Sequence, residues 1–322
     1  MYKHLILLIF FACAWVAALG VRAQNFPAKP VRIIVPYAPG GGSDFVARLC
    51  AQPLQQQLGQ NVIVENCAGA GGIVGTEVAA KAAPDGYTLL VVPISHAANI
   101  SLTPKLPFHP EKDFAPIVQI ASAANVVLAH PSLPARSVAD LVKLARARPT
   151  ELSYASSGSG SSTHLATELF KMLAKVDVLH VPYKGGGPAL VDLIAGQVSM
   201  YFASLPAAGP HLKSGRVRAL AVTGKQRVAA LSDLPTVHES GVPGYEYIGW
   251  YGLLAPVATP AAIVTRLNGE ANKFIKTKEF SERIAADGAE PAGGTPEIFA
   301  ALIRSEIVKW AAVVKHAGLA GK

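Results

Sequence analysis

Apolar runs with strand character alternate with helical segments between residues 31 and 92. Residues 31–35, 62–65 and 87–92 are nearly continuous apolar runs, a pattern typical of strands that are buried on both faces. Between the first two runs, apolar residues recur at helical spacing: Phe45, Val46, Leu49, Leu54 and Leu58. Pro53 predicts a kink in that helix, and a second helix is predicted through Val78 and Ala80. This β-α-β-α-β order predicts a parallel sheet.

The alternation restarts after residue 120 and predicts a second α/β unit. Its predicted strands are residues 125–129, 153–155, 178–181, 198–202 and 218–223, and its predicted helices are residues 141–147, 164–173 and 188–195. Ser137 and Asp140 resemble a capping box before the first of these helices. A last strand at residues 250–255 precedes two predicted C-terminal helices. The second begins with Thr295 as N-cap and Pro296 at its first helical position.

Three loops share one design, in which a strand leads through glycine or serine into a helix. They lie at residues 40–44, 69–72 and 156–163. Glycine lets the backbone approach a ligand closely, and the free N–H groups of a helix N-terminus attract an anion. Such loops also serve simply as tight turns. Their recurrence in both units favours a ligand held between the two.

Sequence motifs for cofactors and catalysis are incomplete. The loop at residues 40–44 lacks the lysine of a phosphate-binding loop, and Val74 stands where a dinucleotide-binding fingerprint needs glycine. Ser157 stands where a hydrolase elbow around Ser159 needs glycine. No cysteine and histidine spacing fits a zinc site. We therefore expect no cofactor and no metal, and keep an exported hydrolase using Ser159 or His164 as the alternative class.

Composition narrows the choice further. The 322 residues are 51% hydrophobic and only 16% charged. This composition excludes a disordered chain, and it leaves few charged side chains to form a nucleic-acid-binding surface.

Residues 1–23 combine Lys3, an apolar run and the small residues Val21 and Ala23 at the −3 and −1 positions. This pattern predicts a cleavable signal peptide and export to the periplasm. The mature chain stays moderately basic, because only Lys3 and Arg22 are lost from a net charge of +8.

Several stretches, in order along nearly the whole mature chain, resemble the periplasmic substrate-binding proteins of tripartite tricarboxylate transporters, the Bug receptors. They are residues 29–36 (KPVRIIVP) with the PGGGSD loop, 64–66 (VEN) before GAGG, 84–90 (PDGYTLL), 154–158 (YASSG), 180–185 (HVPYKG), 218–223 (RALAVT) and 234–237 (LPTV). The resemblance implies an α/β fold of two lobes, the type II periplasmic binding-protein or Venus flytrap architecture, in which each lobe is a mostly parallel sheet flanked by helices. It implies a receptor, not an enzyme.

Such a receptor captures a small organic acid, a mono- or dicarboxylate, and delivers it to membrane transporter subunits. A ligand sensor for a signalling partner has the same fold and remains a second alternative. We place residues 24–122 and 243–322 in one lobe and residues 123–242 in the other, and expect a monomer that binds no nucleic acid.

The expected ligand-binding residues lie in the glycine loops and at the ends of nearby strands. Ser157, Ser159 and Thr163 are the favoured hydroxyl donors. Helix capping is favoured for Asp44, and packing or capping is favoured for His164. Lys184 either pairs with a distal ligand carboxylate or is solvated. The full set is Gly40, Gly41, Ser43, Asp44, Ala70, Gly71, Gly72, Ser156, Ser157, Ser159, Thr163, His164, Lys184, Gly185 and Ala203.

Two positions depart from the family's usual pattern. Cys67-Ala68 stands where Arg-Pro is usual, and Ala203-Ser204 stands where Asp-Asn is usual. Alanine at 203 removes an acidic group near the expected crevice, which argues against recognition of an amino group and leaves carboxylate capture intact.

The sequence allows a disulfide between Cys50 and Cys67, but two free thiols are favoured.

Overall fold

The computed structural model describes residues 26–149, 151–286, 288–317 and 320, and the predicted signal peptide lies outside these residues. One sheet has the order β2-β1-β3-β9-β4-β10. Its first three strands are parallel, whereas β9, β4 and β10 join in antiparallel pairs. The bounds are β1 Val31–Val35, β2 Val62–Asn66, β3 Thr88–Pro93, β4 Phe114–Ala129, β9 Ile248–Pro256 and β10 Ala289–Pro291.

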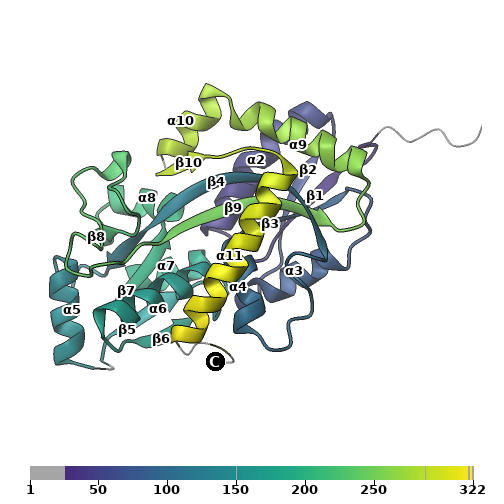
Figure 1. Ribbon diagram of the computed structural model, residues 1–322. Coiled ribbons are helices and arrows are strands. Elements are labelled where there is room, and N and C mark those ends of the chain that lie inside the picture. The colour runs from purple at the N-terminus through teal and green to yellow at the C-terminus, as the bar shows by residue number, and fades with distance from the viewer. Residues whose placement is uncertain (1–25, 150, 287, 318–319, 321–322) are drawn as a thin grey trace, which may run out of the picture.

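A second sheet has the order β8-β4-β7-β5-β6 and shares β4 with the first. Strands β5, β6 and β7 are mutually parallel, and β4 is antiparallel to both of its neighbours. Their bounds are β5 Ser153–Ser156, β6 Leu179–Pro182, β7 Met200–Ser204 and β8 Arg218–Val222. Figure 1 shows β4 and β9 running side by side across the molecule between the two groups of strands.

Helices cover both faces of the sheets and form separate apolar cores. On one face of the first sheet, α2 (Gly42–Leu58), α9 (Ala261–Ile275) and α10 (Lys278–Ala286) pack with strand residues such as Ile33 and Val91. A second core joins α3 (Ile73–Ala80), α4 (Ser95–Leu102) and α11 (Pro296–Ala317) to α5 (Val138–Ala147) and α6 (Ser162–Ala174). A third lies between the second sheet, α7 (Gly186–Ile194) and α8 (Leu205–Lys213).

Several predicted elements differ from the structure. Strand β4 begins at Phe114, well before the predicted residue 125, and α4, α8 and β10 were not predicted. The C-terminal part contains three helices, α9, α10 and α11, where two were expected. The hydrophobic periodicity of the sequence does not predict helix α4, because nearly all of its residues are buried and the helix has no polar face. Helix α2 runs through Pro53 to Leu58 as one element.

The predicted caps and thiols are observed. Ser137 accepts a hydrogen bond from the Asp140 amide at 3.0 Å, and Asp140 accepts one from the Arg136 amide. The Ile298 amide donates to the Thr295 side chain, which caps α11. Cys50 and Cys67 are free thiols, the first buried and the second half-buried.

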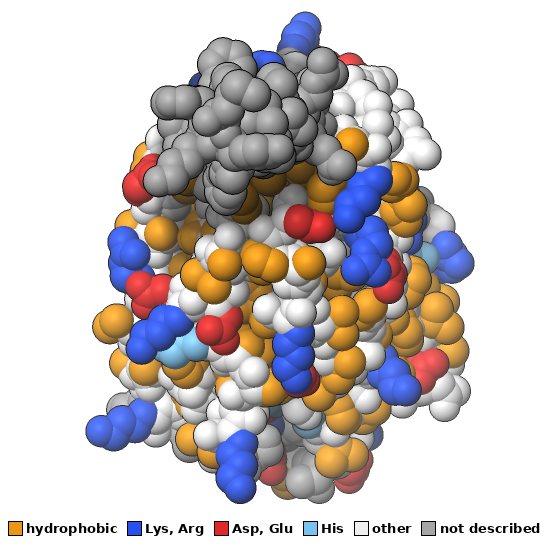
Figure 2. Space-filling model, turned by 90° about the vertical axis from the view of Figure 1, so that its right-hand side faces the viewer, with side chains coloured by type: hydrophobic (Ala, Val, Ile, Leu, Met, Phe, Trp, Pro, Cys, Tyr) orange, Lys and Arg blue, Asp and Glu red, His pale blue; other side chains and the backbone are white. Residues whose placement is uncertain are grey.

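Charged side chains are dispersed on the face seen in Figure 2, where lysine and arginine are scattered among aspartate, glutamate and apolar groups. Exposed pairs such as Arg32 with Glu65, 3.1 Å apart, illustrate this mixing. Among the described residues, no helix is both long enough and apolar enough to span a membrane.

Candidate ligand site

A small cavity lies where the loops of the two sheets meet. Its volume is about 20 Å³, roughly the space needed by one water molecule. The lining residues are Tyr37, Gly41, Gly42, Ser43, Ser157, Ser162, Thr163, Gly186, Tyr201, Ser204 and Tyr251. None of these described residues has a carboxylate, lysine or arginine side chain. The cavity is therefore polar without carrying formal charge of its own at neutral pH.

Four helices begin at this cavity. Gly41 is the N-cap of α2, Ser161 caps α6 through a side-chain bond to the His164 amide, and Gly185 precedes α7. Ser204 is the N-cap residue of α8. Because a helix N-terminus carries free N–H groups and a partial positive charge, the convergence of four favours an anion in the cavity.

Hydroxyl groups complete the wall and are tied to one another. Tyr37 donates to the carbonyl of Gly71 at 2.8 Å, and its oxygen lies 3.0 Å from Ser95 Oγ. Tyr201 Oη lies 3.1 Å from Ser157 Oγ, which also accepts from Thr163. Burial raises the pKa of Tyr37 to about 12 and raises the pKa of Tyr201 and Tyr251 as well. These phenols therefore stay protonated, and the Tyr201 and Tyr251 hydroxyls can donate to a ligand anion, whereas the Tyr37 proton is used on the Gly71 carbonyl.

Around the cavity the two sheets approach each other through backbone, in a contact that we call the glycine seam: Gly41 against Gly186, Gly71 against Ser159, Gly185 against Ala38 and Gly187 against Pro39. The Ala38 amide donates across it to the Lys184 carbonyl at 2.9 Å. Gly71 has φ +63°, and a Cβ added to it would lie 1.9 Å from the Ser159 carbonyl oxygen. Only glycine permits this approach.

Four of the sequence-predicted residues line the cavity: Gly41, Ser43, Ser157 and Thr163. Gly71 and Gly72 support the wall from behind, since Gly71 accepts from Tyr37 and a Cβ on Gly72 would meet the Tyr37 ring. Ala70 is exposed at the start of the same short turn.

Asp44 faces away from the cavity and has a structural role. It accepts from the Gly40 amide at 3.0 Å and from Asn66, and it forms a 3.0 Å ion pair with Arg48. Burial alone would raise the pKa of Asp44, but hydrogen bonds from Arg48, Gly40 and Asn66 outweigh it and lower the pKa. The carboxylate thus fixes the first loop and leaves the Gly41 and Ser43 positions to face the ligand.

His164 and Ser156 belong to an aromatic stack beneath the third loop. The rings of His164 and His180 are 4.3 Å apart, and His180 Nε2 lies 2.6 Å from Ser156 Oγ. His164 Nδ1 accepts from the Gly160 amide at 3.1 Å. Ser159 is exposed and presents its backbone, not its side chain, to Gly71. The structure therefore does not bring Ser159 and His164 together as a hydrolase pair.

The remaining predicted residues contribute backbone or packing. Lys184 is exposed, and it is its carbonyl that crosses the glycine seam. A Cβ on Gly185 would lie 2.7 Å from the Ala38 amide nitrogen. Ala203 is fully buried in the third apolar core, whereas its neighbour Ser204 lines the cavity. Because side chains alternate along a strand, Ala203 points away from the crevice to which the sequence assigned it.

Sequence reasoning missed the tyrosines of the cavity, Tyr37, Tyr201 and Tyr251, together with Gly42, Ser162, Gly186 and Ser204. Tyr251 Oη and Ser204 Oγ crowd Gly42, since a Cβ there would lie 2.1 Å and 2.6 Å from them. Their positions along the chain were a usable signal. Tyr37 lies two residues after the end of β1 and Ser204 ends β7, and ligands of α/β proteins bind at such strand ends.

Comparisons with known proteins agree along nearly the whole chain. A family model described as the tripartite tricarboxylate transporter family receptor matches residues 46–319. Protein BugT of Bordetella pertussis is 39% identical over 312 residues, which cover 96% of this chain and 95% of that protein. The solved structure of Rhodopseudomonas palustris MatC with bound malate is 35% identical, has a TM-score of 0.86 and covers 90% of this chain and 100% of that chain.

A second solved structure, R. palustris Rpa4515 with adipate, is 40% identical with a TM-score of 0.89 and covers 91% of this chain and 99% of that chain. These likenesses confirm the predicted α/β fold with helices flanking the sheets.

Proposed function

Because the chain belongs to the tripartite tricarboxylate transporter receptor family, we propose that its cavity captures a small dicarboxylate for delivery to membrane transporter subunits. Proteins of this family are periplasmic solute receptors, and this chain is a carboxylate-binding receptor of that kind. The solved relatives hold adipate and malate, both of which carry two carboxylates. Export through the predicted signal peptide and action as a monomer belong to the proposal.

The observation that carries the proposal is the convergence of four helix N-termini and several hydroxyls on one cavity. A carboxylate there accepts hydrogen bonds from backbone amides and from the hydroxyls of residues such as Ser43 and Tyr201. No lysine or arginine of the described lining supplies a counter-charge, so the dipoles and hydroxyls must hold the anion.

Capture requires the two sheets to separate and close again. A volume of about 20 Å³ does not admit a dicarboxylate, so the structure represents a closed arrangement that must open for entry. We place the hinge where β4 and β9 pass between the sheets, near residues 124 and 248, and divide the lobes there, at residues 24–122 with 243–322 and 123–242. Ligand binding then stabilises the closed form.

Calorimetry on the full mature chain tests the proposal. Adipate and malate are expected to bind, whereas the neutral diamide of adipate and a neutral sugar are not. Ser43→Ala should weaken adipate binding about tenfold, because it removes a hydrogen-bond donor to an anion, while Ser305→Ala, which alters an exposed helix residue, should not. Binding of the sugar alone, or turnover of an ester substrate, would contradict the proposal.

A further inference from the structure

One peptide bond of the third loop, between Ser159 and Gly160, lies in the contact between the two sheets. Its carbonyl is directed across the glycine seam, since a Cβ on Gly71 would lie 1.9 Å from the Ser159 carbonyl oxygen and 3.0 Å from the carbonyl carbon. A Cβ on Gly160 would lie 3.3 Å from Asn99 Oδ1 of α4, which packs with the first sheet. The orientation of this peptide therefore affects how the sheets close.

His164 of α6 holds the other side of the same peptide. The Gly160 amide donates to His164 Nδ1 at 3.1 Å. Because a trans peptide is planar, its N–H and C=O point in opposite directions. The bond to His164 thus also fixes the Ser159 carbonyl toward Gly71. The flanking backbone is free to turn without that bond, because Gly158 has φ +128° and Gly160 has φ +77°.

His164 can accept this hydrogen bond only as a neutral imidazole. Nδ1 must be unprotonated to accept from the Gly160 amide, so the ring proton lies on Nε2. Burial lowers the pKa of His164 below 6.5, an effect that Glu168 opposes and Lys171 reinforces. The ring is therefore neutral at pH 7. In acid the added proton goes to Nδ1, which becomes a donor facing the Gly160 N–H.

The surroundings of His164 make it the first ring of its stack to be protonated. The rings of His164 and His180 are 4.3 Å apart, and burial, together with the nearby charge of a protonated His164, lowers the pKa of His180 to about 4. Glu168 accepts from Tyr154 at 2.5 Å and from Lys171 at 2.8 Å. The titratable and charged groups around His164 in the described chain are His180 of β6, Tyr154 of β5, Glu168 and Lys171 of α6, and Asp177, which pairs with Lys171.

We propose that His164 is a positioning residue for closure of the site: its neutral ring orients the Ser159–Gly160 peptide against Gly71, and its protonated ring releases that peptide. This inference rests on the proposed function and adds a pH dependence to it. His164 does not contact the ligand. It acts through the loop that also carries Ser157 and Thr163, so the affinity for a carboxylate is highest at neutral pH and falls in acid.

Three variants separate the acceptor, the ring and the titration. His164→Asn keeps an acceptor, Oδ1, near the position of Nδ1 and cannot be protonated there. His164→Phe keeps a ring in the stack and has no acceptor. His238→Asn is the matched control, because His238 Nδ1 also accepts from a glycine amide, that of Gly244 at 3.0 Å, but in an exposed segment away from the cavity.

Calorimetry with adipate at about pH 7 and about pH 5 tests the role of His164 on the full mature chain. At neutral pH, His164→Asn should bind within about twofold of the unaltered chain, whereas His164→Phe should bind about fivefold more weakly, as expected for one lost hydrogen bond. Between the two pH values, the unaltered chain and His238→Asn should lose about fivefold more affinity than His164→Asn. Protonation of adipate itself affects all of these proteins equally.

The two pH values also distinguish this role from a merely structural one, which would weaken binding by His164→Asn and His164→Phe alike. Parallel pH profiles for the unaltered chain and His164→Asn, or weak binding by His164→Asn at neutral pH, would overturn the inference. Circular dichroism at both pH values checks that each protein is folded, and the comparison with His164→Asn decides even if His164→Phe is not. If the unaltered chain binds no carboxylate at neutral pH, the proposed function itself fails.

Discussion

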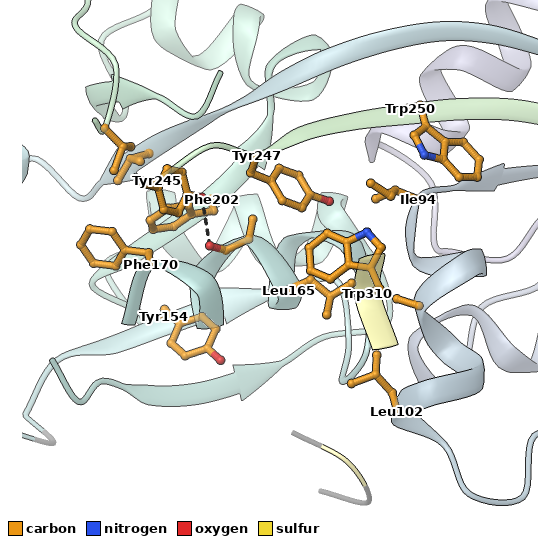
Figure 3. Close-up of a cluster of buried hydrophobic side chains, with 14 of the residues drawn as sticks. Ile94, Leu102, Tyr154, Leu165, Phe170, Phe202, Tyr245, Tyr247, Trp250 and Trp310 are labelled. Atoms are coloured by element: carbon orange, nitrogen blue, oxygen red, sulfur yellow. Dashed lines mark hydrogen bonds between the residues drawn. The ribbon is translucent and has the colours of Figure 1, made fainter. Parts of the chain in front are cut away.

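Two contacts join the same pair of sheets and are built from opposite chemistry. At the glycine seam, backbone packs against backbone, and the Ala38 amide donates a hydrogen bond to the Lys184 carbonyl. Behind the cavity, Trp310 of α11 packs against Tyr247 with ring centroids 5.9 Å apart, in a core that also holds Leu102 and Leu165. We call this second contact the aromatic seam, and Figure 3 shows it.

The difference indicates which contact opens. The glycine seam buries few apolar side chains, so separating it exposes mainly polar backbone that water solvates readily. Separating the aromatic seam would expose large apolar surfaces to water, at a free-energy cost of about 25 cal/mol for each Å². Helix α11 touches both α4 of the first sheet and α6 of the second. The aromatic seam is therefore suited to stay packed as a pivot while the glycine seam opens and closes.

The largest expected effect comes from blocking the glycine seam. Gly71→Val should abolish adipate binding, because its Cβ would overlap the Ser159 carbonyl and valine disfavours φ +63°. Gly59→Val is the matched control, since Gly59 has φ +67° but nothing within 4 Å. It should lower stability and preserve affinity. Normal calorimetric binding by Gly71→Val, with an intact circular dichroism spectrum, would show that closure does not need this contact.

Removing the aromatic seam should act on stability. Trp310→Ala deletes a side chain that is 2% exposed, which should lower the free energy of unfolding by about 3–5 kcal/mol. Val308→Ala on the same helix alters a side chain that is 72% exposed and should change it by less than about 0.5 kcal/mol. Urea unfolding measures both. Similar losses in the two variants would remove the distinction between the seams.

Acid should weaken the core behind the cavity through His96 of α4. Its Nε2 lies 2.9 Å from the Pro110 carbonyl, and burial lowers its pKa from 6.5 to about 4. Because the unfolded chain binds the proton more readily, this contribution is complete above about pH 6.5 and is lost as the pH falls toward 4. Over this pH range, the free energy of unfolding should fall by about 3 kcal/mol, the energy that corresponds to the lowering of the His96 pKa from 6.5 to about 4.

His96→Gln is the matching variant, since its amide N–H keeps a donor for Pro110 and cannot titrate. Urea unfolding between pH 7 and pH 4 should show a distinctly shallower decline for this variant than for the unaltered chain. Parallel pH profiles for the two proteins would mean that His96 does not carry this dependence.

The smallest effect is expected at Lys184. The Lys184 side chain is exposed, and only the backbone carbonyl of this residue takes part in the glycine seam. Lys184→Ala should therefore weaken adipate binding by less than about 1 kcal/mol. Calorimetry at low and high salt checks this. A large loss that salt abolishes would place a charged side chain, and not the backbone, at the centre of recognition.

Local sequence patterns sufficed for most elements and for the three glycine loops. Continuous apolar runs predicted strands such as β1 and β3, and glycine before a helical segment predicted the loops at residues 40–44 and 156–163. They did not predict α4, buried nearly all round, or α8, which forms despite Pro210 inside it. In both helices tertiary packing outweighs the local signal.

The sequence by itself determined that loops with free helix N-termini would face a ligand, because strand-to-helix order and glycine content are local properties. Only the tertiary structure decided which side chains turn inward: Ser157 faces the cavity, while Ser156 bonds His180 and Ser159 is exposed. It also brought Tyr37, Tyr201 and Tyr251 together from distant segments. The direction of a side chain follows from backbone dihedrals and from partners far along the chain, which no local pattern records.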